Sequence, residues 1–518
     1  MSIDYQREDY KKAVPEWELL SDVVAGERVI KERDSGLKGG VRHNQATAQT
    51  QAGHLSYSRK RYLPMPNATD LSLDNLARYE NYLARAVFYN ATGRTLRGLV
   101  GTAFKRAPEV ELDQLDYLLK DADGQGVGLL QQAQAALAAV MKAGRFGLWV
   151  DFPATGGESS RADLDAGNVR PTILAYKPDS IINWRTEKVG AEHRLALVVL
   201  SEVAEEVAED GYSVTETDQI RVLRMDYPLV TLADETVTRD MTAAKVYQVE
   251  VHKKVEGGSF ELAEQYTPAD AQGASWDRIP FTFIGAQDNN PSIDQSPLLD
   301  MAVVNLAHYR NSADYEDSAF FCGQPQPYMT GLDEEWRDWL EKNGVYIGAR
   351  APIMLPVDAE FGFAQAQPNT LVKEAMDQKE QQMRALGARL LTKGEAVRTA
   401  TEAQNDNETE HSVLSLVAEN VSEAYTSALQ WAALYQGIDP DSVSMELSRD
   451  YMEVTLDAQT ITALVAAWQG GALPDSDMIA NFKRGGLIDP ERADDDILEE
   501  LSEQRVTVPL DDAESSAN

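Results

Sequence analysis

The chain has 518 residues, enough for several domains with a substantial buried core. Hydrophobic residues make up 43% of it and charged residues 25%, which is typical of globular proteins rather than disordered or fibrous ones. Its 84 acidic and 48 basic residues give a formal net charge of −36. This charge disfavours a surface that binds DNA tightly, because phosphate contacts require lysine and arginine, but it allows a protein past which DNA slides.

The compartment is constrained by the cysteine count and by the apolar segments. The single cysteine, Cys322, cannot form a disulfide within the chain, which fits assembly in a reducing cytoplasm. The first residues, Met1 to Trp17, are polar and charged, without the apolar segment of a signal peptide. No stretch approaches the roughly 18 apolar residues of a membrane span. We therefore expect a soluble protein.

The N-terminal part is expected to be an arm followed by helices. Residues 1–55 are polar, which predicts an arm that packs on another surface, with a frayed terminus as the alternative. Apolar residues at three- and four-residue spacing predict a helix from Leu71 to Leu99. A second helix is predicted from Leu129 to Ala143 with Gly144 as its cap, followed by a strand from Phe146 to Phe152.

Residues 171–285 are predicted to form mostly β-strands. Short runs rich in β-branched and aromatic residues alternate there with turn residues. The expected strands are Ile173–Tyr176, Ile181–Trp184, Leu195–Val199, Ile220–Met225, Val246–Val251 and Ile279–Ile284. Together with the helices before them, these strands indicate one α+β region.

Three long helices are predicted in the second half of the chain. The first runs from an N-cap at Ser296, with a proline next to it, to Cys322, where a glycine and two prolines follow. The second extends from Thr370 to about Leu391, and the third from Glu408 to Tyr435 with Gly437 as its cap.

A small insert and a polar loop separate these helices. The insert is expected to contain a helix from Trp336 to Asn343 and three strands, at Val345–Ile347, Ile353–Leu355 and Ala359–Phe363. The loop spans Thr392 to Asn407. Two long helices that flank an insert predict a helical hairpin, and such hairpins can pack side by side around a closed ring to line a channel.

The C-terminal part is expected to hold a strand, two helices and a tail. The strand is Tyr451–Leu456, and the helices are Ala458–Trp468 and Pro474–Phe482. From Asp489 onward the chain is mostly acidic and polar, which predicts disorder.

No catalytic or metal-binding pattern occurs in the sequence. There is no G-x-x-x-x-G-K-[ST] phosphate loop, no H-E-x-x-H and no G-x-S-x-G. Gly124, Gly126 and Gly128 precede a helix without a strand before them, so we interpret them as a plain loop. The histidines are scattered without cysteine partners and are interpreted as ordinary surface or core residues: His43, His54, His193, His252, His308 and His411. We expect neither catalytic residues nor a metal or cofactor.

Several segments, in this order and spacing, carry a resemblance to a known family. They are YENYLARAVFYNATGRTLRGLVGTAFKRAPE (79–109), DADGQGVGLLQQA (121–133), RFGLWVDFPA (145–154), RPTILAYKPDSIINWR (170–185), SPLLDMAVVNLAHYRNSADYE (296–316) and TATEAQNDNETEHSVLSLVAENV (399–421). The chain resembles the portal proteins of tailed bacteriophages, most closely those with a DUF4055 domain. The resemblance extends from about Tyr57 to Gly486.

The resemblance implies the α+β phage portal fold, with a wing, a helical stem, a small α/β clip and a helical crown, assembling into a ring. The implied parts are an N-terminal arm (1–55), the wing (56–295), stem helix 1 (296–322), the clip (323–368), stem helix 2 (369–391), a tunnel loop (392–407), a long wing helix (408–437), a return strand of the wing (438–457), the crown (458–488) and an acidic tail (489–518).

The resemblance also implies a function and partners. A portal ring, dodecameric in the virion, sits at one capsid vertex and forms the channel for DNA packaging and ejection. Its implied partners are the terminase large subunit, head–tail adaptors, major capsid and scaffolding proteins, and the double-stranded DNA in the channel. The protein would be assembled in the host cytoplasm, without a membrane, and would not be an enzyme, because the packaging motor hydrolyses the ATP.

Candidate DNA contacts follow from this assignment. In the tunnel loop, Lys393 and Arg398 are the only basic residues, and they lie near Thr399, Thr401 and Gln404. The basic residues of the second stem helix are the alternative: Lys373, Lys379, Arg384 and Arg389. Pairing of these cations with the neighbouring Glu374, Glu380 and Glu395 is the other interpretation.

Three aromatic residues of the clip, Trp336, Trp339 and Tyr346, predict an interface for the motor or the adaptors, with a local core as the equal alternative. Two other classes of protein remain open. One is another virion neck or minor capsid protein with a long helical hairpin, and the other is an enzyme with an unrecognised site.

Overall fold

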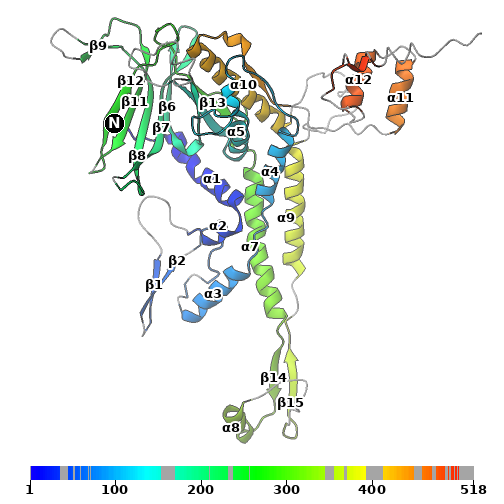
Figure 1. Cartoon of the computed structure of the whole chain (residues 1–518). Coiled ribbons are helices and arrows are strands. Elements are labelled where there is room, and N and C mark those ends of the chain that lie inside the picture. The colour runs from blue at the N-terminus through cyan, green and yellow to red at the C-terminus, as the bar shows by residue number, and fades with distance from the viewer. Residues whose placement is uncertain are drawn as a thin grey trace, which may run out of the picture. The chain divides into compact units, whose positions relative to one another are not determined.

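Figure 1 shows the structure, a computed structural model of the chain. The chain divides into two compact units, Met1–Arg449 and Asp450–Asn518, which are described separately. The structure describes residues 2–34, 45–50, 53–58, 60–67, 69–70, 72–152, 170–208, 210–231, 237–255, 257–344, 355–366, 370–391, 412–448, 458–469, 474–484 and the single positions 488, 492–494, 496–498 and 500.

The N-terminal segment, predicted as an arm that packs on another surface, contains two helices, and the first of them packs into the core. They are α1 (Glu8–Ala25) and α2 (Glu27–Glu32). Trp17 is 7% exposed and its indole N–H donates to the carbonyl oxygen of Ala143 at 2.9 Å, while Leu20 is fully buried. These apolar residues share one face of an otherwise charged helix, and the average polarity of the segment hides that face. A hairpin of β1 (Gln45–Thr50) and β2 (Gly53–Ser58) follows.

The helix predicted from Leu71 to Leu99 is two helices, α3 (Leu73–Arg85) and α4 (Ala91–Ala103). The break occurs because Asn90 caps α4, its side-chain oxygen accepting a hydrogen bond from the backbone N–H of Gly93 at 2.8 Å. The short strand β3 (Glu109–Glu111) comes next.

Two antiparallel sheets form the β part of the first unit, as the strand pattern predicts. The smaller has the order β13-β4-β5 and the larger the order β12-β11-β8-β7-β6. Helix α5 (Leu129–Ala143) precedes β4 and ends at Gly144, whose φ of +68° is the predicted left-handed cap. The strands are β4 (Arg145–Asp151), β5 (Thr172–Tyr176), β6 (Ile181–Val189), β7 (Glu192–Val207), β8 (Val214–Asp226), β11 (Val246–Lys254), β12 (Phe260–Tyr266) and β13 (Phe281–Gly285).

The remaining small elements of the first unit are a pair of short strands and some single turns. The strands β9 (Leu229–Thr231) and β10 (Val237–Arg239) pair with each other. Short 3₁₀ turns lie at Asp116–Leu119, Pro178–Ser180 and Pro440–Ser442.

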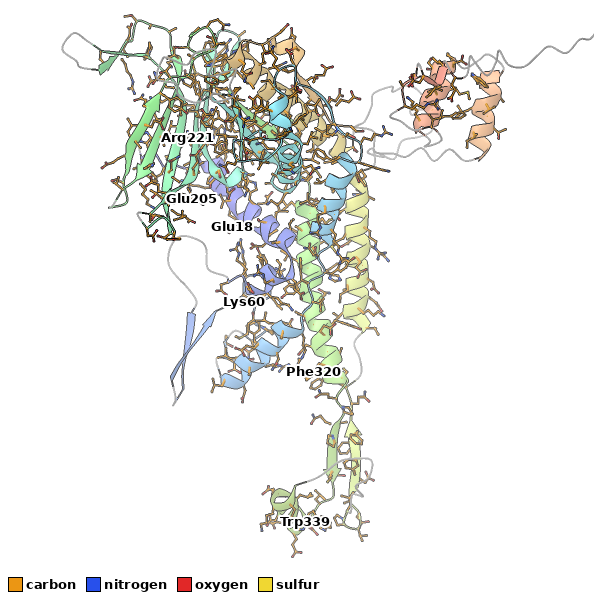
Figure 2. The ribbon with its side chains drawn as sticks, in the orientation of Figure 1. Glu18, Lys60, Glu205, Arg221, Phe320 and Trp339 are labelled. Atoms are coloured by element: carbon orange, nitrogen blue, oxygen red, sulfur yellow. The ribbon has the colours of Figure 1, made fainter. Side chains whose placement is uncertain are left out.

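Aromatic side chains hold α1 and the two sheets together in one core. Trp149 of β4 is fully buried and donates its indole N–H to the hydroxyl oxygen of Tyr247 in β11 at 2.8 Å. The guanidinium of Arg221 in β8, labelled in Figure 2, lies 4.9 Å from the Trp149 ring centroid and pairs with Glu202 at 2.9 Å. At Arg221 the core therefore accepts a cation because a carboxylate and an aromatic face both contact it.

The predicted helical hairpin is present as α7 (Leu299–Cys322) and α9 (Thr370–Arg389), which pack along each other. A Cβ added to Gly387 would lie 3.2 Å from Met301 Cε, and His308 faces Glu380. Both pairs fit one antiparallel register.

The N-cap predicted for the first helix of this hairpin is two residues early. Ser296 forms a turn in front of α7, where its hydroxyl oxygen accepts the N–H of Leu298 at 3.2 Å. The N-cap position of α7 is Leu298 instead.

Between α7 and α9 the insert contains β14 (Gln326–Thr330), α8 (Glu334–Asn343) and β15 (Glu360–Ala364). The sequence did not predict β14, since prolines normally end strands, but Pro327 lies opposite Phe363 in a two-stranded ribbon. The strands predicted at 345–347 and 353–355 fall outside the described residues, except Leu355, which is not in a strand.

The third long helix, α10 (Val413–Gln436), begins after Ser412, which caps it, and ends at the predicted Gly437 with φ +72°. Its start predicted at Glu408 lies outside the described residues, as do the tunnel loop and the strand at 451–456. The short strand β16 (Ser444–Glu446) returns to pair with β3.

The second unit contains the two helices predicted near the C-terminus. They are α11 (Ala458–Gln469) and α12 (Asp475–Arg484), which contact each other. The indole N–H of Trp468 donates to Asp475 Oδ1 at 2.5 Å. Residues 501–518, in the predicted tail, lie outside the described residues.

Replacing Trp17 with Ala tests whether α1 belongs to the core. We expect the free energy of unfolding to fall by about 3–5 kcal/mol, as for other buried aromatic residues. Lys12→Ala on the exposed side of the same helix is the control and should change it by less than about 0.5 kcal/mol. Equal denaturation midpoints for the two variants would mean that Trp17 of α1 does not belong to the core.

Candidate functional site

The antiparallel pair α7–α9 is the central feature of the candidate site. The N-terminal half of α7 is buried, and the polar residues Asn305, His308 and Ser312 lie on its inner face at spacings of three and four residues. A polar stripe on the buried face of a helix must find hydrogen-bond partners on neighbouring segments. Asn305 and Ser312 find them in the chain between α3 and α4.

Hydrogen bonds of Asn305 and Ser312 hold α7 against the segment that joins α3 to α4. The Asn305 carboxamide oxygen accepts hydrogen bonds from the backbone N–H and the hydroxyl of Thr92, at 3.1 and 3.0 Å. Its NH₂ donates to the carbonyl oxygen of Tyr89 at 2.7 Å. Further along α7, on the same face, the Ser312 hydroxyl oxygen accepts the N–H of Val87 at 3.0 Å. These hydrogen bonds together fix the position of α7.

The outer half of α7 is held by charged and aromatic side chains of α3. The Tyr82 hydroxyl donates to Asp314 Oδ1 at 2.6 Å, and Arg85 pairs with Asp317 at 2.9 Å. The Arg85 guanidinium also lies 3.5 Å from the ring centroid of Phe320, labelled in Figure 2. Because these contacts are polar and half-exposed, this end of α7 is less firmly packed than the Asn305 end.

His308 lies in the seam between α7 and α9. It is 3% exposed, and its Nε2 is 3.8 Å from Glu380 Oε1, beyond hydrogen-bond distance. Tyr89 lies against it with ring centroids 6.3 Å apart. Burial lowers the pKa of His308, while the charge of Glu380 opposes this shift and that of Lys379 adds to it. The imidazole is therefore neutral in the folded protein at neutral pH.

The four stem cations proposed as DNA contacts have different surroundings. Arg384 pairs with Glu380 at 3.3 Å, one of the acids that the alternative interpretation named, and Lys379 donates to the carbonyl oxygen of Ala375 at 3.3 Å. Lys373 and Arg389 are exposed, and neither forms an ion pair within the described residues. The two exposed cations, at the two ends of α9, remain available to a ligand.

The tunnel-loop candidates Lys393, Arg398, Thr399, Thr401 and Gln404 lie outside the described residues, so their placement stays a prediction. The helices that bracket the loop do meet: the backbone N–H of Leu414 in α10 donates to the carbonyl oxygen of Leu390, next to the last turn of α9, at 3.2 Å.

The insert exposes its aromatic residues. No residue of 323–344 or 355–366 is buried. Trp339, labelled in Figure 2, is 53% exposed. Its ring meets that of Trp336 edge to face with the centroids 5.5 Å apart. Tyr346, the third aromatic candidate, lies outside the described residues. Within the described part, the two tryptophans contact each other rather than a local core, which favours their interpretation as an interface.

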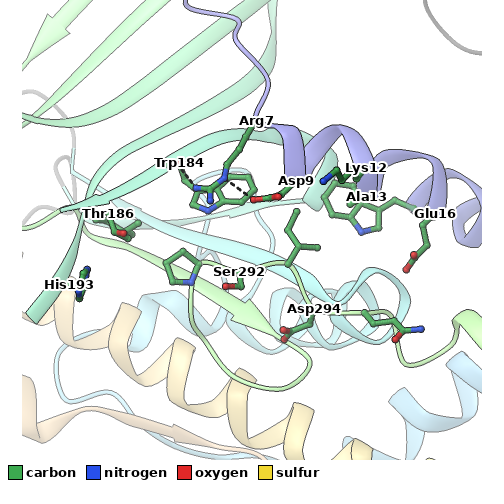
Figure 3. A pocket seen from close by; sticks show the side chains of 15 residues that line it. Arg7, Asp9, Lys12, Ala13, Glu16, Trp184, Thr186, His193, Ser292 and Asp294 are labelled. Carbon is green, nitrogen blue, oxygen red and sulfur yellow. Dashed lines mark hydrogen bonds and ion pairs between the residues drawn. The ribbon is translucent and has the colours of Figure 1, made fainter. Parts of the chain in front are cut away.

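An open pocket of about 680 Å³ lies between α1, the strands β6 and β7, and the loop before α7 (Figure 3). The Arg7 guanidinium there already donates to Asp9 and to the carbonyl oxygen of Trp184, each at 3.0 Å. The pocket contains none of the candidate residues predicted from the sequence.

The wall of this pocket is stabilised by Arg145, which is 1% exposed. Its guanidinium donates to the carbonyl oxygens of Pro291 and Ser292 at 2.8 and 3.1 Å and lies 3.9 Å from the Trp184 ring centroid. Burial lowers its pKa to about 9. This arginine therefore holds the loop before α7 in place rather than presenting a charge to a ligand.

The glycine-rich segment before α5 forms a loop that satisfies its own backbone. Asp123 Oδ1 accepts the N–H groups of Gln125 and Val127, and Asp121 Oδ1 accepts that of Gly126. The carboxylates occupy the amides that a phosphate would need. Within the described residues there is also no cluster of three potential metal ligands, and no helix among them is long and apolar enough to cross a membrane.

Sequence reasoning missed Asn305 and His308 as residues that position the hairpin. The available signal was a polar residue at every third or fourth position on the face of α7 that should have been apolar. The hydrogen-bond partners of Asn305 lie more than 200 residues away in the sequence, for example Thr92 at a separation of 213, and only the fold reveals them.

One family model matches the part of the chain that contains the hairpin. The family described as "Domain of unknown function (DUF4055)" matches residues 297–436, from the start of α7 to the end of α10. The likeness to DUF4055 proteins that the sequence predicted is thus confirmed for this span. No curated protein matches the chain.

Solved structures give weak matches. One is a chain in "Virion of native gene transfer agent (GTA) particle", with 16% identity, a TM-score of 0.37, and coverage of 76% of this chain and 90% of that one. Another is a chain in "Neck of empty GTA particle computed with C6 symmetry", with 15% identity, a TM-score of 0.37, and coverage of 78% and 92%. TM-scores this low define no common fold, so no role is taken from these matches.

The depressed pKa of His308 predicts how stability depends on pH. In the unfolded chain this histidine takes up a proton near its ordinary value of 6.5, whereas the folded protein resists protonation to lower pH. The free energy of unfolding should therefore fall as pH drops below about 6.5, by up to about 1.4 kcal/mol for each unit of depression.

Replacing His308 with Asn should remove this contribution, so that the loss of stability between about pH 8 and about pH 5.5 is smaller in the variant than in the wild type. His193→Asn, which alters an exposed histidine, is the control. Chemical denaturation at both pH values measures the difference, and identical pH profiles for the wild type and His308→Asn would contradict the account.

The exposure of Trp339 predicts a small stability change for Trp339→Ala. We expect less than about 1 kcal/mol, against the roughly 3–5 kcal/mol typical of a buried tryptophan. Trp149→Ala, at a fully buried position, provides the comparison. A loss for Trp339→Ala that matches the loss for Trp149→Ala in thermal unfolding would show that the insert has a local core.

Proposed function

We propose that this chain is the portal subunit of a tailed bacteriophage or phage-like particle. Copies of it form a ring at one capsid vertex, which is the channel for DNA packaging and ejection. The observation that carries the proposal is the antiparallel pair α7–α9, anchored in an α+β body at one end and carrying an exposed insert at the other. This arrangement is what the resemblance to phage portal proteins predicts.

In this proposal the parts of the chain take the roles that the resemblance implies. The body with its two sheets is the wing, and α7 and α9 are the stem. The ribbon β14–β15 with α8 is the clip, which meets the terminase large subunit and later the head–tail adaptors. The residues after α9 form the tunnel loop, α10 is the long wing helix, and α11 and α12 belong to the crown.

The stem is suited to a channel wall. Helix α9 has 20 residues, which corresponds to about 30 Å of wall at 1.5 Å per residue. Its exposed surface combines cations with acids and glutamines, including Lys373, Glu374, Asp377 and Gln381. A mixed polar surface guides a duplex without holding it, because only uncompensated cations add phosphate affinity.

A passive ring also agrees with the chemistry of the chain. The sequence holds no phosphate loop, so we propose that the protein is not an enzyme and that a partner ATPase supplies the force. Ring, virion location, capsid and scaffolding partners, and assembly in the host cytoplasm all belong to this proposal.

Negative-stain electron microscopy of the purified full-length protein tests the proposal. We expect rings with a central hole, because a heterologous contact that closes generates a ring. The resemblance to portal proteins predicts a copy number near twelve. A protein that stays monomeric or dimeric under conditions of virion assembly would contradict a portal. That result would favour a different neck or minor capsid component.

A further inference from the structure

The segment around helix α4 is one of several stretches of this acidic chain that contain no acid. Between Glu80 and Glu109 there is no aspartate or glutamate, although 84 of the 518 residues are acidic. The segment carries five basic residues: Arg85, Arg94, Arg97, Lys105 and Arg106. Its centre is helix α4. A stretch this depleted of acids would be positively charged in a protein whose remaining surface repels anions.

The helix presents two distinct faces. Thr92, Leu96, Leu99 and Ala103 lie on the inner face and are buried. The outer face is a stripe of Arg94, Arg97, Gly98 and Gly101, at spacings of three and four residues, and all four are exposed. We call these four residues the α4 stripe.

The cations of the α4 stripe are open to a ligand. Arg94 has its guanidinium 5.3 Å from the ring centroid of Tyr89, which is itself 45% exposed. Arg97 has no ion pair within the described residues. A Cβ added at Gly98 or Gly101 would meet no atom within 4 Å, so no neighbouring side chain covers the helix backbone at these two glycines. A bulky polyanion could approach the helix closely there.

The surroundings of α4 connect the stripe to the expected channel. The helix contacts both α9 and α10 (Figure 1), and Gly387 of α9 packs on Thr95 of α4, where an added Cβ would lie 3.6 Å from its side chain. Residues 392–411 join α9 to α10, and the backbone bond from Leu414 to Leu390 brings the two ends of this connection together. The α4 stripe therefore belongs to a helix that contacts both helices that bracket the tunnel loop.

We propose that the α4 stripe contacts the phosphate backbone of double-stranded DNA in the channel. This inference rests on the proposed function and adds a contact element to it. The choice of DNA as the ligand rests on charge. Cations within reach are enough to bind phosphate groups, and such contacts do not depend on the base sequence of the DNA. Arg94 and Arg97 on each copy would form a belt of cations around the ring. These contacts are few and salt-sensitive, which suits a channel that must let DNA move.

A second copy of the chain is the other partner with suitable charge, because the protein is acidic. The composition of the α4 stripe favours DNA. Arginine is common both in DNA contacts and in protein interfaces, but a stable protein interface also has an apolar centre with aromatic anchors. The α4 stripe offers two arginines and two glycines, without an exposed apolar side chain among them.

Two sets of variants of the full-length protein test the proposal. Arg94→Gln/Arg97→Gln removes both cations of the stripe, and Lys177→Gln/Lys188→Gln removes two exposed cations from the β-sheet region as the control. Gly98→Glu adds a negative charge within the stripe, and Gly98→Gln adds a side chain of the same shape without charge. Because Gly98 faces open space, neither Gly98 variant should disturb packing.

The measurement is the affinity of the assembled protein for a short fluorescent DNA duplex across a series of salt concentrations, with the assembly state checked by electron microscopy. We expect Arg94→Gln/Arg97→Gln to bind several-fold more weakly and to lower the slope of log affinity against log salt by about 2, one unit for each phosphate that the two arginines no longer neutralise. Gly98→Glu should bind more weakly than Gly98→Gln, and the sheet variant should bind as the wild type does.

Three results would overturn the proposal. The first is unchanged DNA affinity in Arg94→Gln/Arg97→Gln. The second is equal affinity of the Gly98→Glu and Gly98→Gln variants. The third is loss of assembly in the arginine variant while the sheet variant assembles, which would assign the stripe to a contact between copies. Failure of the wild type to form rings would instead refute the proposed function, and the DNA affinities of the same variants would still decide the role of the stripe.

Discussion

The side chain of Asn305 connects the parts of the first unit on which the other features depend. It is fully buried, and its three hydrogen bonds reach Thr92 and Tyr89 at the break between α3 and α4. Removing one partner would leave buried polar groups unsatisfied, at a cost of about 1–3 kcal/mol for each group. Because α3 ends and α4 begins at this break, the same hydrogen bonds set the positions of both helices against α7.

The packing of α7 against α9 depends on the position that the hydrogen bonds of Asn305 give to α7. Helix α7 presents Met301 and His308 to α9, where Gly387 allows close approach and Glu380 faces the imidazole. Helix α4, fixed at its start by Asn90 and Thr92, also contacts α9 at Gly387, through Thr95. The result is a helix pair whose inner end is rigid, whereas the insert at its outer end has no buried residue in its described part. The proposed channel, which would bind different partners in succession, calls for such a firmly packed wall with an exposed tip.

Charged residues also have different roles in different parts of the chain. The chain carries −36, so most of its surface repels DNA, while cations are kept at α4 and at the ends of α9. The arginines of the core, Arg145 and Arg221, are held over aromatic rings and by carbonyl or carboxylate oxygens. Positive charge is therefore structural in the core, and near the helix pair it includes exposed cations that a ligand can reach.

The sequence predicted the elements whose signal is local and missed those that depend on distant partners. Periodicity located α5, α7, α9, α11 and α12, and the glycine caps at Gly144 and Gly437 were correct. The break between α3 and α4 at Asn90 was missed because the apolar spacing continues across it. Strand β14 was missed because it contains Pro327, which a strand tolerates only where its edge is free, as in this two-stranded ribbon. For the site, the hairpin could be predicted, but not the partners of Asn305 and His308, nor the exposure of the α4 stripe.

The central claim is that α7 and α9 form the wall of a channel made by many copies of the chain. A cryo-electron microscopy map of the assembled protein, at a resolution that separates helices from strands, tests it most directly. The account predicts that α9 and the root of the segment after Leu391 face the central hole, with the five-stranded sheet on the outside. A hole lined by the five-stranded sheet, or an assembly in which α9 is covered on every side, would contradict it.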